Sequence, residues 1–443
     1  MNCKMRLRTL FAILSVCTLT FAQSETATMH LTLDKAIEIA LSDNPTMKVA
    51  ETEIQLKEVS KSEAWQNLLP SATLDGAIVY NAKVAAMKVD MGDGVTRELK
   101  MGKDDSNTWN GAVQVAIPLY APAVYKTMSL TKSDLELAVE KARGSKLDLI
   151  NQVTKAYYQL MLAQDSYQVL LGNYKQAERN YNIVNAKFEQ GKVSEFDKIS
   201  AEVQMTNAWP SVISGQKTIE IAMLQMKVLM GITANINLVI DDNLKNYEGD
   251  MAHYSGNIFD LTNNSTLRQI DLQGELLNKQ RKILNTNFMP TLALVGSYQY
   301  QSMSNTNWEV HNYNWSNASS LALSVSIPLY KASNFTKLKS NKIQQWQLAE
   351  NRINTERQLR MQAQGQLDKM VASAEQLETN KKSVELAKKE VTISEKRYEV
   401  GKGTILELNS SQVSLTNMQL TYHNSIYDYL VAKSEFETIT GKE

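Results

Sequence analysis

The hexapeptide Val115-Ala116-Ile117-Pro118-Leu119-Tyr120 returns as Val325-Ser326-Ile327-Pro328-Leu329-Tyr330, about 210 positions later in a chain of 443 residues. The same spacing relates Lys187-Phe188-Glu189-Gln190-Gly191-Lys192 to Arg397-Tyr398-Glu399-Val400-Gly401-Lys402. Similarity at one fixed spacing is typical of an internal repeat. The sequence therefore predicts a first structural repeat over residues 23–231 and a second over 263–443, joined by a connecting segment at 232–262.

Each repeat contains a long stretch whose apolar residues have helical spacing and which is not interrupted by proline. No proline lies between Pro122 and Gln190, or between Tyr330 and Val400. About 70 residues at a rise of about 1.5 Å each would form a helix of roughly 100 Å. Helices longer than a globular domain indicate a coiled-coil-like tube or stalk. Shorter helices are predicted at 32–67, 196–230, 265–287 and 405–439, the first with Thr32 as its N-cap.

Four further segments alternate apolar residues with small or polar ones, as β-strands do. They are 72–81, 109–117, 292–301 and 321–327. A tilted strand needs about 9–11 residues to cross a bilayer, and aromatic residues gather at membrane interfaces. Aromatic residues cluster near the ends of these segments, at Tyr80, Trp109, Tyr120, Tyr300, Trp308, Tyr313, Trp315 and Tyr330. From alternation alone, a sheet outside the membrane that packs on helices is equally open.

The number of strands limits the membrane interpretation. Four strands cannot close a barrel, and an open sheet edge in lipid would leave backbone groups without hydrogen bonds. If these strands cross a membrane, several copies of the chain must share one barrel.

The first residues predict a cleaved export signal at 1–22. Basic residues precede an apolar stretch from Leu10 to Phe21, and small residues follow where a signal peptidase would cut. An anchoring helix would need roughly 20 apolar residues, more than this stretch provides. Both cysteines, Cys3 and Cys17, lie in this segment, so the exported chain would have no thiol. The alternative of a lipid on Cys17 is less favoured because the bulky Val16 precedes it.

Composition and motifs argue against several classes of function. Lys plus Arg equals Asp plus Glu, at 47 each, and no basic run is interleaved with aromatic residues, so a nucleic-acid partner is not expected. The four histidines are far apart in sequence and lack metal-ligand spacing. No phosphate-binding glycine loop or nucleophile elbow is present. We therefore expect no enzyme, no cofactor and no metal site.

Residues 31–41, Leu-Thr-Leu-Asp-Lys-Ala-Ile-Glu-Ile-Ala-Leu, followed by Asn44-Pro45, resemble the N-terminal signature of TolC-like outer-membrane efflux proteins. The doubled Phe/Tyr-x-x-Gly-x-x-Ser/Thr element is similar to the two helix-hairpin tips of that family. The resemblance implies a mainly α fold, in which long helical hairpins form an α-barrel. Four strands from each chain would contribute to a trimeric, twelve-stranded β-barrel in outer-membrane lipid.

The resemblance also implies a function. The homotrimer would be the outer-membrane channel of a tripartite efflux or type I secretion system, a passive conduit that exports solutes or polypeptides. It would extend into the periplasm and dock a periplasmic adaptor (membrane fusion) protein and an inner-membrane pump. The alternative is a soluble periplasmic coiled-coil adaptor or scaffold whose strands form a small capping sheet.

The resemblance further implies site residues, carried over by position. The adaptor-docking tips fall on Gly191, Lys192, Val193 and Ser194, and on Gly401, Lys402, Gly403 and Thr404. The pore constriction falls on Glu407, with Asp197 at the corresponding place in the first repeat. Two positions depart from the best-known member: Ser410 replaces a second acidic constriction residue, and Gly403 replaces a basic residue that helps to keep that channel shut.

Each of these residues also has a simpler explanation. A glycine at a helix end usually forms only a surface turn, so Gly191 or Gly401 alone would not indicate a docking site. Glu407 alone is typical of a solvated helix carboxylate. It is the repetition of the glycines at matched positions that favours a functional role.

Overall fold

The computed structural model describes residues 28–90, 92, 96–232, 236–251 and 259–442. The predicted export signal, with Cys3 and Cys17, lies outside these residues. The chain forms two compact units. We call Met1–Ala40, Val153–Ala252 and Gln376–Tyr427 the tip unit, and Leu41–Gln152, His253–Glu375 and Asp428–Glu443 the sheet unit. Both units draw on both sequence repeats, so the repeat boundaries at 23–231, 232–262 and 263–443 are not unit boundaries and stay a prediction.

Two helices of 68 residues dominate the chain, α3 (Pro122–Glu189) and α6 (Ala332–Glu399). They confirm the prediction made from the missing prolines. The shorter helices α4 (Glu195–Leu229), α5 (Ser265–Thr286) and α7 (Ile405–Thr440) agree with the predicted segments. In the described part of the chain, no helix is both long enough and apolar enough to cross a membrane.

The prediction of a single helix over 32–67 is wrong, because the chain forms α1 (Leu33–Asp43) and α2 (Pro45–Gln66). The break falls at Asn44, whose backbone is extended. Proline lacks an amide hydrogen and sterically disfavours a helical conformation in the residue before it. Asn44 Oδ1 then accepts a hydrogen bond from the Thr46 amide at 2.7 Å and caps α2. Thr32 caps α1 as predicted, since its Oγ1 accepts from the Lys35 amide at 3.3 Å.

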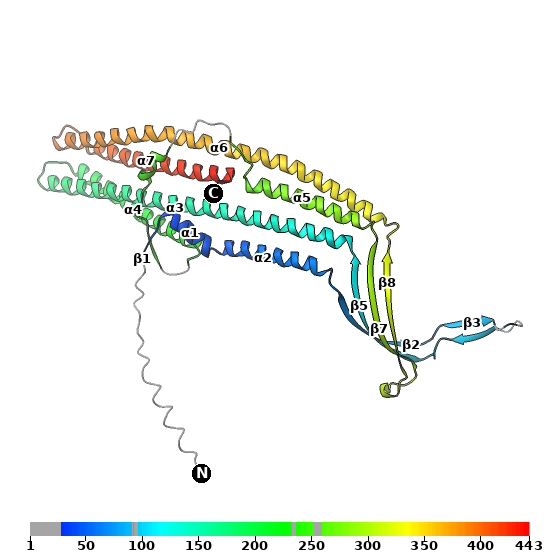
Figure 1. Ribbon diagram of the computed structural model, residues 1–443. Helices are drawn as coiled ribbons and strands as arrows, with labels where there is room; N and C mark the ends of the chain where they lie inside the picture. The colour runs from blue at the N-terminus through cyan, green and yellow to red at the C-terminus, as the bar shows by residue number, and fades with distance from the viewer. Residues whose placement is uncertain (1–27, 91, 93–95, 233–235, 252–258, 443) are drawn as a thin grey trace, which may run out of the picture. The chain divides into compact units, whose positions relative to one another are not determined.

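The four predicted strands form one antiparallel sheet in the sheet unit (Figure 1). Its order is β2-β5-β7-β8, with bounds Ser71–Asn81, Ser106–Tyr120, Thr291–Asn305 and Trp315–Ser326. Within one chain β2 and β8 are therefore edge strands. Apolar side chains on both edges face solvent, with Leu74 79% exposed and Leu321 75% exposed. Exposed apolar strands at a sheet edge are typical of sites of association.

Several elements were not predicted from the sequence. The strands β3 (Ala86–Asp90) and β4 (Thr96–Lys100) form an antiparallel hairpin between β2 and β5. The short strand β1 (Thr28–His30) pairs in parallel with β6 (Asn237–Val239) in the tip unit. Two 3₁₀-helices, η1 (Leu244–Asp250) and the single turn η2 (Val310–Asn312), complete the described elements.

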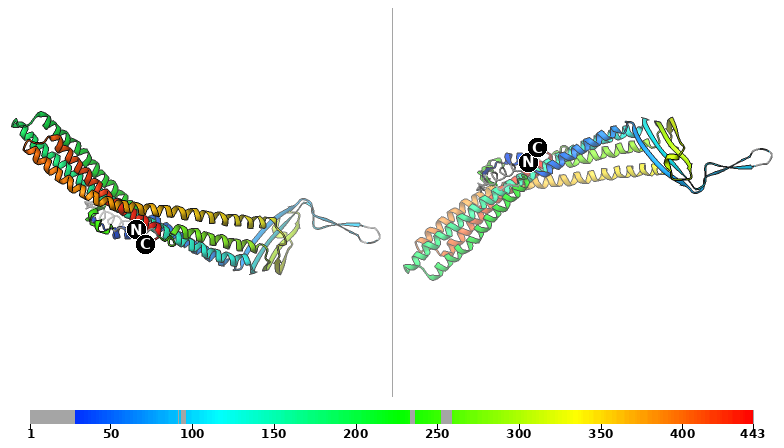
Figure 2. Two further views of the ribbon diagram at one scale, coloured as in Figure 1. Left: turned by 90° about the horizontal axis from the view of Figure 1, so that it is seen from above. Right: turned by 90° about the horizontal axis from the view of Figure 1, so that it is seen from below.

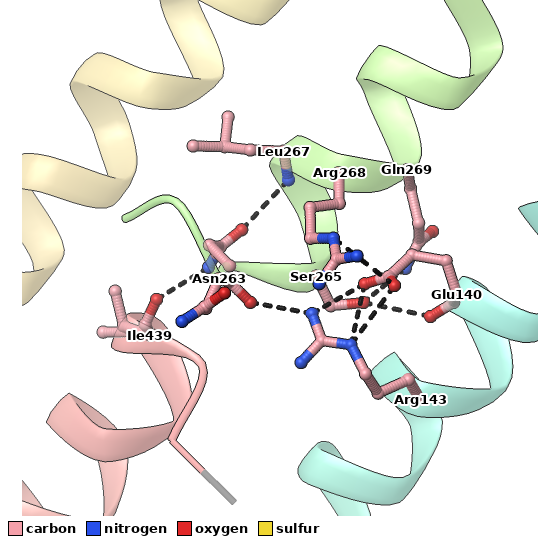
Figure 3. A network of polar contacts seen from close by, with 9 residues as sticks. Glu140, Arg143, Asn263, Ser265, Leu267, Arg268, Gln269 and Ile439 are labelled. Carbon is pink, nitrogen blue, oxygen red and sulfur yellow. Dashed lines mark hydrogen bonds and ion pairs between the residues drawn. The ribbon is translucent and has the colours of Figure 1, made fainter. Parts of the chain in front are cut away.

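A network of polar contacts ties α3, α5 and α7 together inside the sheet unit (Figure 3). The buried Glu140 carboxylate lies 2.7 Å from Arg143 Nη2 and 3.7 Å from Arg268 Nε. Arg143 Nη2 also donates to the Asn263 carbonyl oxygen at 2.7 Å. Asn264 Oδ1 caps α5 at the Leu267 amide, while its Nδ2 donates to the Ile439 carbonyl oxygen at 2.8 Å. The start of α5 is thus fixed against the end of α7.

Candidate functional site

In the tip unit two helical hairpins, α3–α4 and α6–α7, run side by side to their turns (Figures 1 and 2). Both turns close in the same way. The Gly191 amide donates to the Phe188 carbonyl oxygen at 2.8 Å, and the Lys192 amide to that of Lys187 at 2.9 Å. The corresponding bonds of Gly401 and Lys402 measure 3.2 and 2.8 Å. This paired pattern satisfies the last carbonyl groups of a helix and requires a left-handed residue.

Glycine is needed at both turns because φ is +71° at Gly191 and +72° at Gly401. A Cβ atom at either position would meet nothing within 4 Å. The requirement therefore comes from the backbone and not from packing inside the chain. The open space beside both glycines leaves the predicted tips accessible to a partner.

The residues after each turn begin the returning helix. Ser194 is the N-cap of α4, and Asp197 completes a capping box by accepting from the Ser194 amide at 3.3 Å and hydroxyl at 2.9 Å. In the second hairpin Thr404 Oγ1 accepts from the Glu407 amide at 3.2 Å. The two predicted constriction residues thus lie at equivalent positions, three residues after the hydroxyl residue that begins each helix. Only the Asp197 carboxylate caps its own helix.

One small apolar core joins the two hairpins behind the turns. It consists of Val184, Ala201, Ile405 and Leu408, with Tyr181, Val193 and Tyr398 packed against it. Because these residues come from α3, α4, α6, α7 and the first turn, the structure brings the predicted tips of both repeats into one site. Val193 contributes to the core, whereas Lys192 and Lys402 are exposed.

Two tip residues, Arg397 and Tyr398, were not predicted as site residues. Arg397 Nη2 donates to the Lys402 carbonyl oxygen at 3.2 Å and lies 3.6 Å from Glu407 Oε2. A Cβ atom on Gly403 would lie 3.0 Å from Arg397 Cβ and 3.3 Å from Glu407 Oε2, so only a small residue fits between them. Although Gly403 is not basic, the tip still has a basic group beside the predicted constriction, because the Arg397 guanidinium lies next to Glu407.

Tyr398 lies between the two hairpins. Its hydroxyl is buried and has no hydrogen-bond partner among the described residues. Burial, and secondarily the negative charge of Asp197, raise the pKa of Tyr398. Lys187 Nζ lies 5.3 Å from the centre of its ring, within the range of a cation–π contact. The repeated Phe/Tyr position of the sequence motif could have pointed to this residue, but its pairing with α3 could not be read from spacing.

A polar seam runs from the tip between α3, α6 and α7. It contains a cavity of about 160 Å³ and a second of about 500 Å³, both lined by Gln176 and Glu395, whose side chains share a hydrogen bond of 2.6 Å. Gln412, only 3% exposed, lines the larger cavity, and neither of its amide atoms has a partner among the described residues. Buried amides are normally hydrogen-bonded, and cavities of this size hold water. The seam is therefore a polar contact with room for water.

Asp165 and His423 both line the larger cavity, and His423 Nδ1 lies 3.5 Å from Asp165 Oδ2. Burial raises the pKa of Asp165, and burial lowers the pKa of His423. Both shifts favour the neutral forms in the folded state. Among the described residues, no group of three or more His, Cys, Asp or Glu side chains could hold a metal ion.

Comparison with known proteins agrees with this architecture. The chain is 19% identical over 356 residues to the outer membrane protein TolC of Vibrio cholerae, covering 76% of this chain and 77% of that protein. The fold is similar to the solved structure of the channel CusC (TM-score 0.75, 14% identity, covering 94% of each chain). It is also similar to that of the CmeC outer membrane channel of Campylobacter jejuni (TM-score 0.69, 16% identity, covering 95% of this chain and 90% of that one).

The family model described as outer membrane efflux protein matches residues 36–231 and 260–442, which is most of the chain. This match confirms the resemblance read from the N-terminal segment and the doubled tips, and it decides against the soluble adaptor or scaffold. The chain belongs to the outer membrane efflux protein family: it is an outer-membrane efflux channel protein that extends into the periplasm.

Proposed function

We propose that three copies of the chain form one passive conduit, to which a periplasmic adaptor and an inner-membrane pump supply cargo and energy. The observation that carries the proposal is the free edge on each side of the four-stranded sheet. Strands alternate in direction from β2 to β8, so β8 of one copy can pair antiparallel with β2 of the next. Twelve strands in three copies then leave no unpaired backbone in lipid.

Apolar stripes on the helices support the same arrangement. In the tip unit, α6 exposes Leu386 (55%) and Ile393 (58%), which are seven residues apart and share one helix face. Also in the tip unit, α4 exposes Phe196, Ile199 and Val203 on one face. Large exposed apolar surfaces are sites of association. Side-by-side packing of copies would bury both stripes.

The assembly can be tested directly. The mass of the purified protein in detergent should be that of three chains, and the same sample should conduct ions in a planar bilayer. A monomer that conducts would contradict the shared barrel.

Docking of the adaptor is proposed at the tips, Gly191–Ser194 and Gly401–Thr404. The exposure of both turns and the empty space beside both glycines support it. We expect that a photo-crosslinker at Lys192 or Lys402 captures the adaptor in cells, whereas one at the exposed Lys217, in the middle of α4, does not. Bulky substitutions at Gly191 and Gly401 should also stop export while the channel still folds. Failure of both tip positions to capture an adaptor would refute the docking assignment without affecting the trimer.

We also propose that Glu407, with Asp197 at the corresponding place of the first repeat, lines the periplasmic mouth. Three-fold symmetry would place three Glu407 carboxylates around one axis, and a carboxylate ring favours cations. Glu407→Gln should weaken cation selectivity and block by multivalent cations in planar bilayers. Because Arg397 lies beside Glu407, Arg397→Gln should change selectivity in the opposite direction. Unchanged selectivity in both variants would place Glu407 on the outer surface.

A further inference from the structure

The β3–β4 hairpin projects beyond the end of the four-stranded sheet (Figure 1) and forms a separate two-stranded sheet. Its base is ordered. The Met101 amide donates to the Ala85 carbonyl oxygen at 2.9 Å, and the Val84 amide to Asp104 Oδ1 at 3.0 Å. Gly102 lies so close to β7 that a Cβ atom there would be 2.6 Å from Ser304 Oγ. The hairpin is therefore held in a defined position relative to the sheet.

Among the described residues, one apolar face of the hairpin has no partner. Met87 is paired with Leu99 and Val89 with Arg97, and paired side chains point to the same side of a two-stranded sheet. Met87 is 56% exposed and Leu99 52%. The opposite face carries the paired Lys88 and Glu98. Two-stranded hairpins are marginally stable alone, so this face needs a surface on which to pack.

A second exposed apolar surface lies at the same end of the sheet, on the connection between β7 and β8 (residues 306–314). There Trp308 is 65% exposed, and Val310 is also exposed. Two hydrogen bonds fix the connection to the sheet, because the Tyr313 hydroxyl and Asn107 Nδ2 both donate to the Asn307 carbonyl oxygen, at 2.7 and 2.8 Å. Glu309 lies between the two apolar residues and is exposed.

In the proposed trimer, the strand directions bring the hairpin of one copy close to the β7–β8 connection of the next copy. The hairpin follows the end of β2 at Asn81, and the connection precedes the start of β8 at Trp315. When β2 of one copy pairs antiparallel with β8 of the next, Asn81 and Trp315 come to the same end of the junction. The hairpin of one copy then rises beside the β7–β8 connection of its neighbour.

We propose that the apolar face of the β3–β4 hairpin packs on the β7–β8 connection of the neighbouring copy, with Met87 and Leu99 against Trp308 and Val310. The proposal rests on the trimer proposed above. Arg97, on the same face as Leu99, is placed to pair with Glu309 of the neighbour. Three equivalent contacts would clasp the copies at the outer rim of the barrel, where a membrane-spanning β-ladder no longer holds them.

Cysteine crosslinking between copies tests the contact, since the sequence has cysteines only at positions 3 and 17. Chains carrying Leu99→Cys are coexpressed with chains carrying Trp308→Cys and treated with a short bismaleimide. We expect covalent dimers of the two chains. In the matched control, Glu98→Cys replaces Leu99→Cys and places the thiol on the opposite face of the same strand, and we expect only background crosslinking.

A charge exchange gives a second readout. Arg97→Glu should reduce the Leu99–Trp308 crosslink to the level of the control, and Glu309→Arg in the neighbouring chain should restore it. If the mass in detergent shows a trimer but Leu99 and Glu98 crosslink equally, the hairpin packs elsewhere, on lipid or on a foreign protein, and the clasp is wrong. If no trimer forms, the failure belongs to the proposed assembly itself.

Discussion

Gly441→Ala is expected to lower the thermal unfolding midpoint of the channel more than Gly191→Ala does. Gly441 ends α7 with φ +73°, and an added Cβ would lie 2.2 Å from the Asn263 carbonyl oxygen and 2.5 Å from its carbonyl carbon. These are backbone atoms, so no side-chain rotation can relieve the overlap. Left-handed strain and overpacking each cost about 1–3 kcal/mol, so the total should be about 2–6 kcal/mol.

The matched control for this prediction is Gly191→Ala. Its φ is almost the same, but its Cβ would meet nothing within 4 Å. Only the left-handed backbone strain remains, about 1–3 kcal/mol. Circular dichroism of both variants in the same detergent should show the larger loss for Gly441→Ala. Equal losses would show that the contact between the end of α7 and Asn263 is not close in solution.

The double substitution Leu386→Glu with Ile393→Glu is expected to convert the proposed trimer into monomers. Both side chains are exposed in the single chain, so the helix itself should tolerate the change. In the trimer each substitution would remove about 1–2 kcal/mol of apolar burial and would place an unpaired carboxylate in the junction, which costs several kcal/mol more. Native mass spectrometry gives the mass, and far-ultraviolet circular dichroism confirms that the helices persist.

Lys388→Glu is the control for this pair. It introduces an acidic side chain on the same helix, about 200° around the axis from Leu386. The trimer should survive this change. A double variant that stays trimeric would show that the α6 stripe does not face another copy, even if the β-barrel is shared.

The sequence predicted the large elements because their signals are local. Helical spacing of apolar residues, uninterrupted by proline between Pro122 and Gln190, was enough for α3, and alternation was enough for the four strands. The error at Asn44 came from reading apolar spacing through an Asn-Pro pair that ends one helix and caps the next. The β3–β4 hairpin was missed because neither of its strands reaches six residues, too short for alternation to be distinctive.

The tip site was predicted only in part, because its geometry depends on contacts between distant segments. The repeated glycines predicted both turns correctly. The role of Asp197 in capping Ser194 could have been read from their spacing, since a hydroxyl followed three residues later by an acid is typical of a helix start. The position of Arg397 beside Glu407 could not have been read from the sequence, because it depends on how the second turn folds back.

Outside the tip site, the close approach of Gly441 to Asn263 could not have been read either, because these residues lie at opposite ends of the second repeat.

If copies join at β2 and β8 as proposed, the free edges of these strands also make pore formation depend on the concentration of chains. In the proposed trimer the sheet is complete only when three copies meet, so the yield of assembled channel depends steeply on the concentration of chains. Before assembly, Leu74, Leu321 and their neighbours remain exposed. Unassembled chains with open apolar edges tend to aggregate. At a low concentration of chains, assembly is therefore slow, and at a high concentration aggregation competes with it.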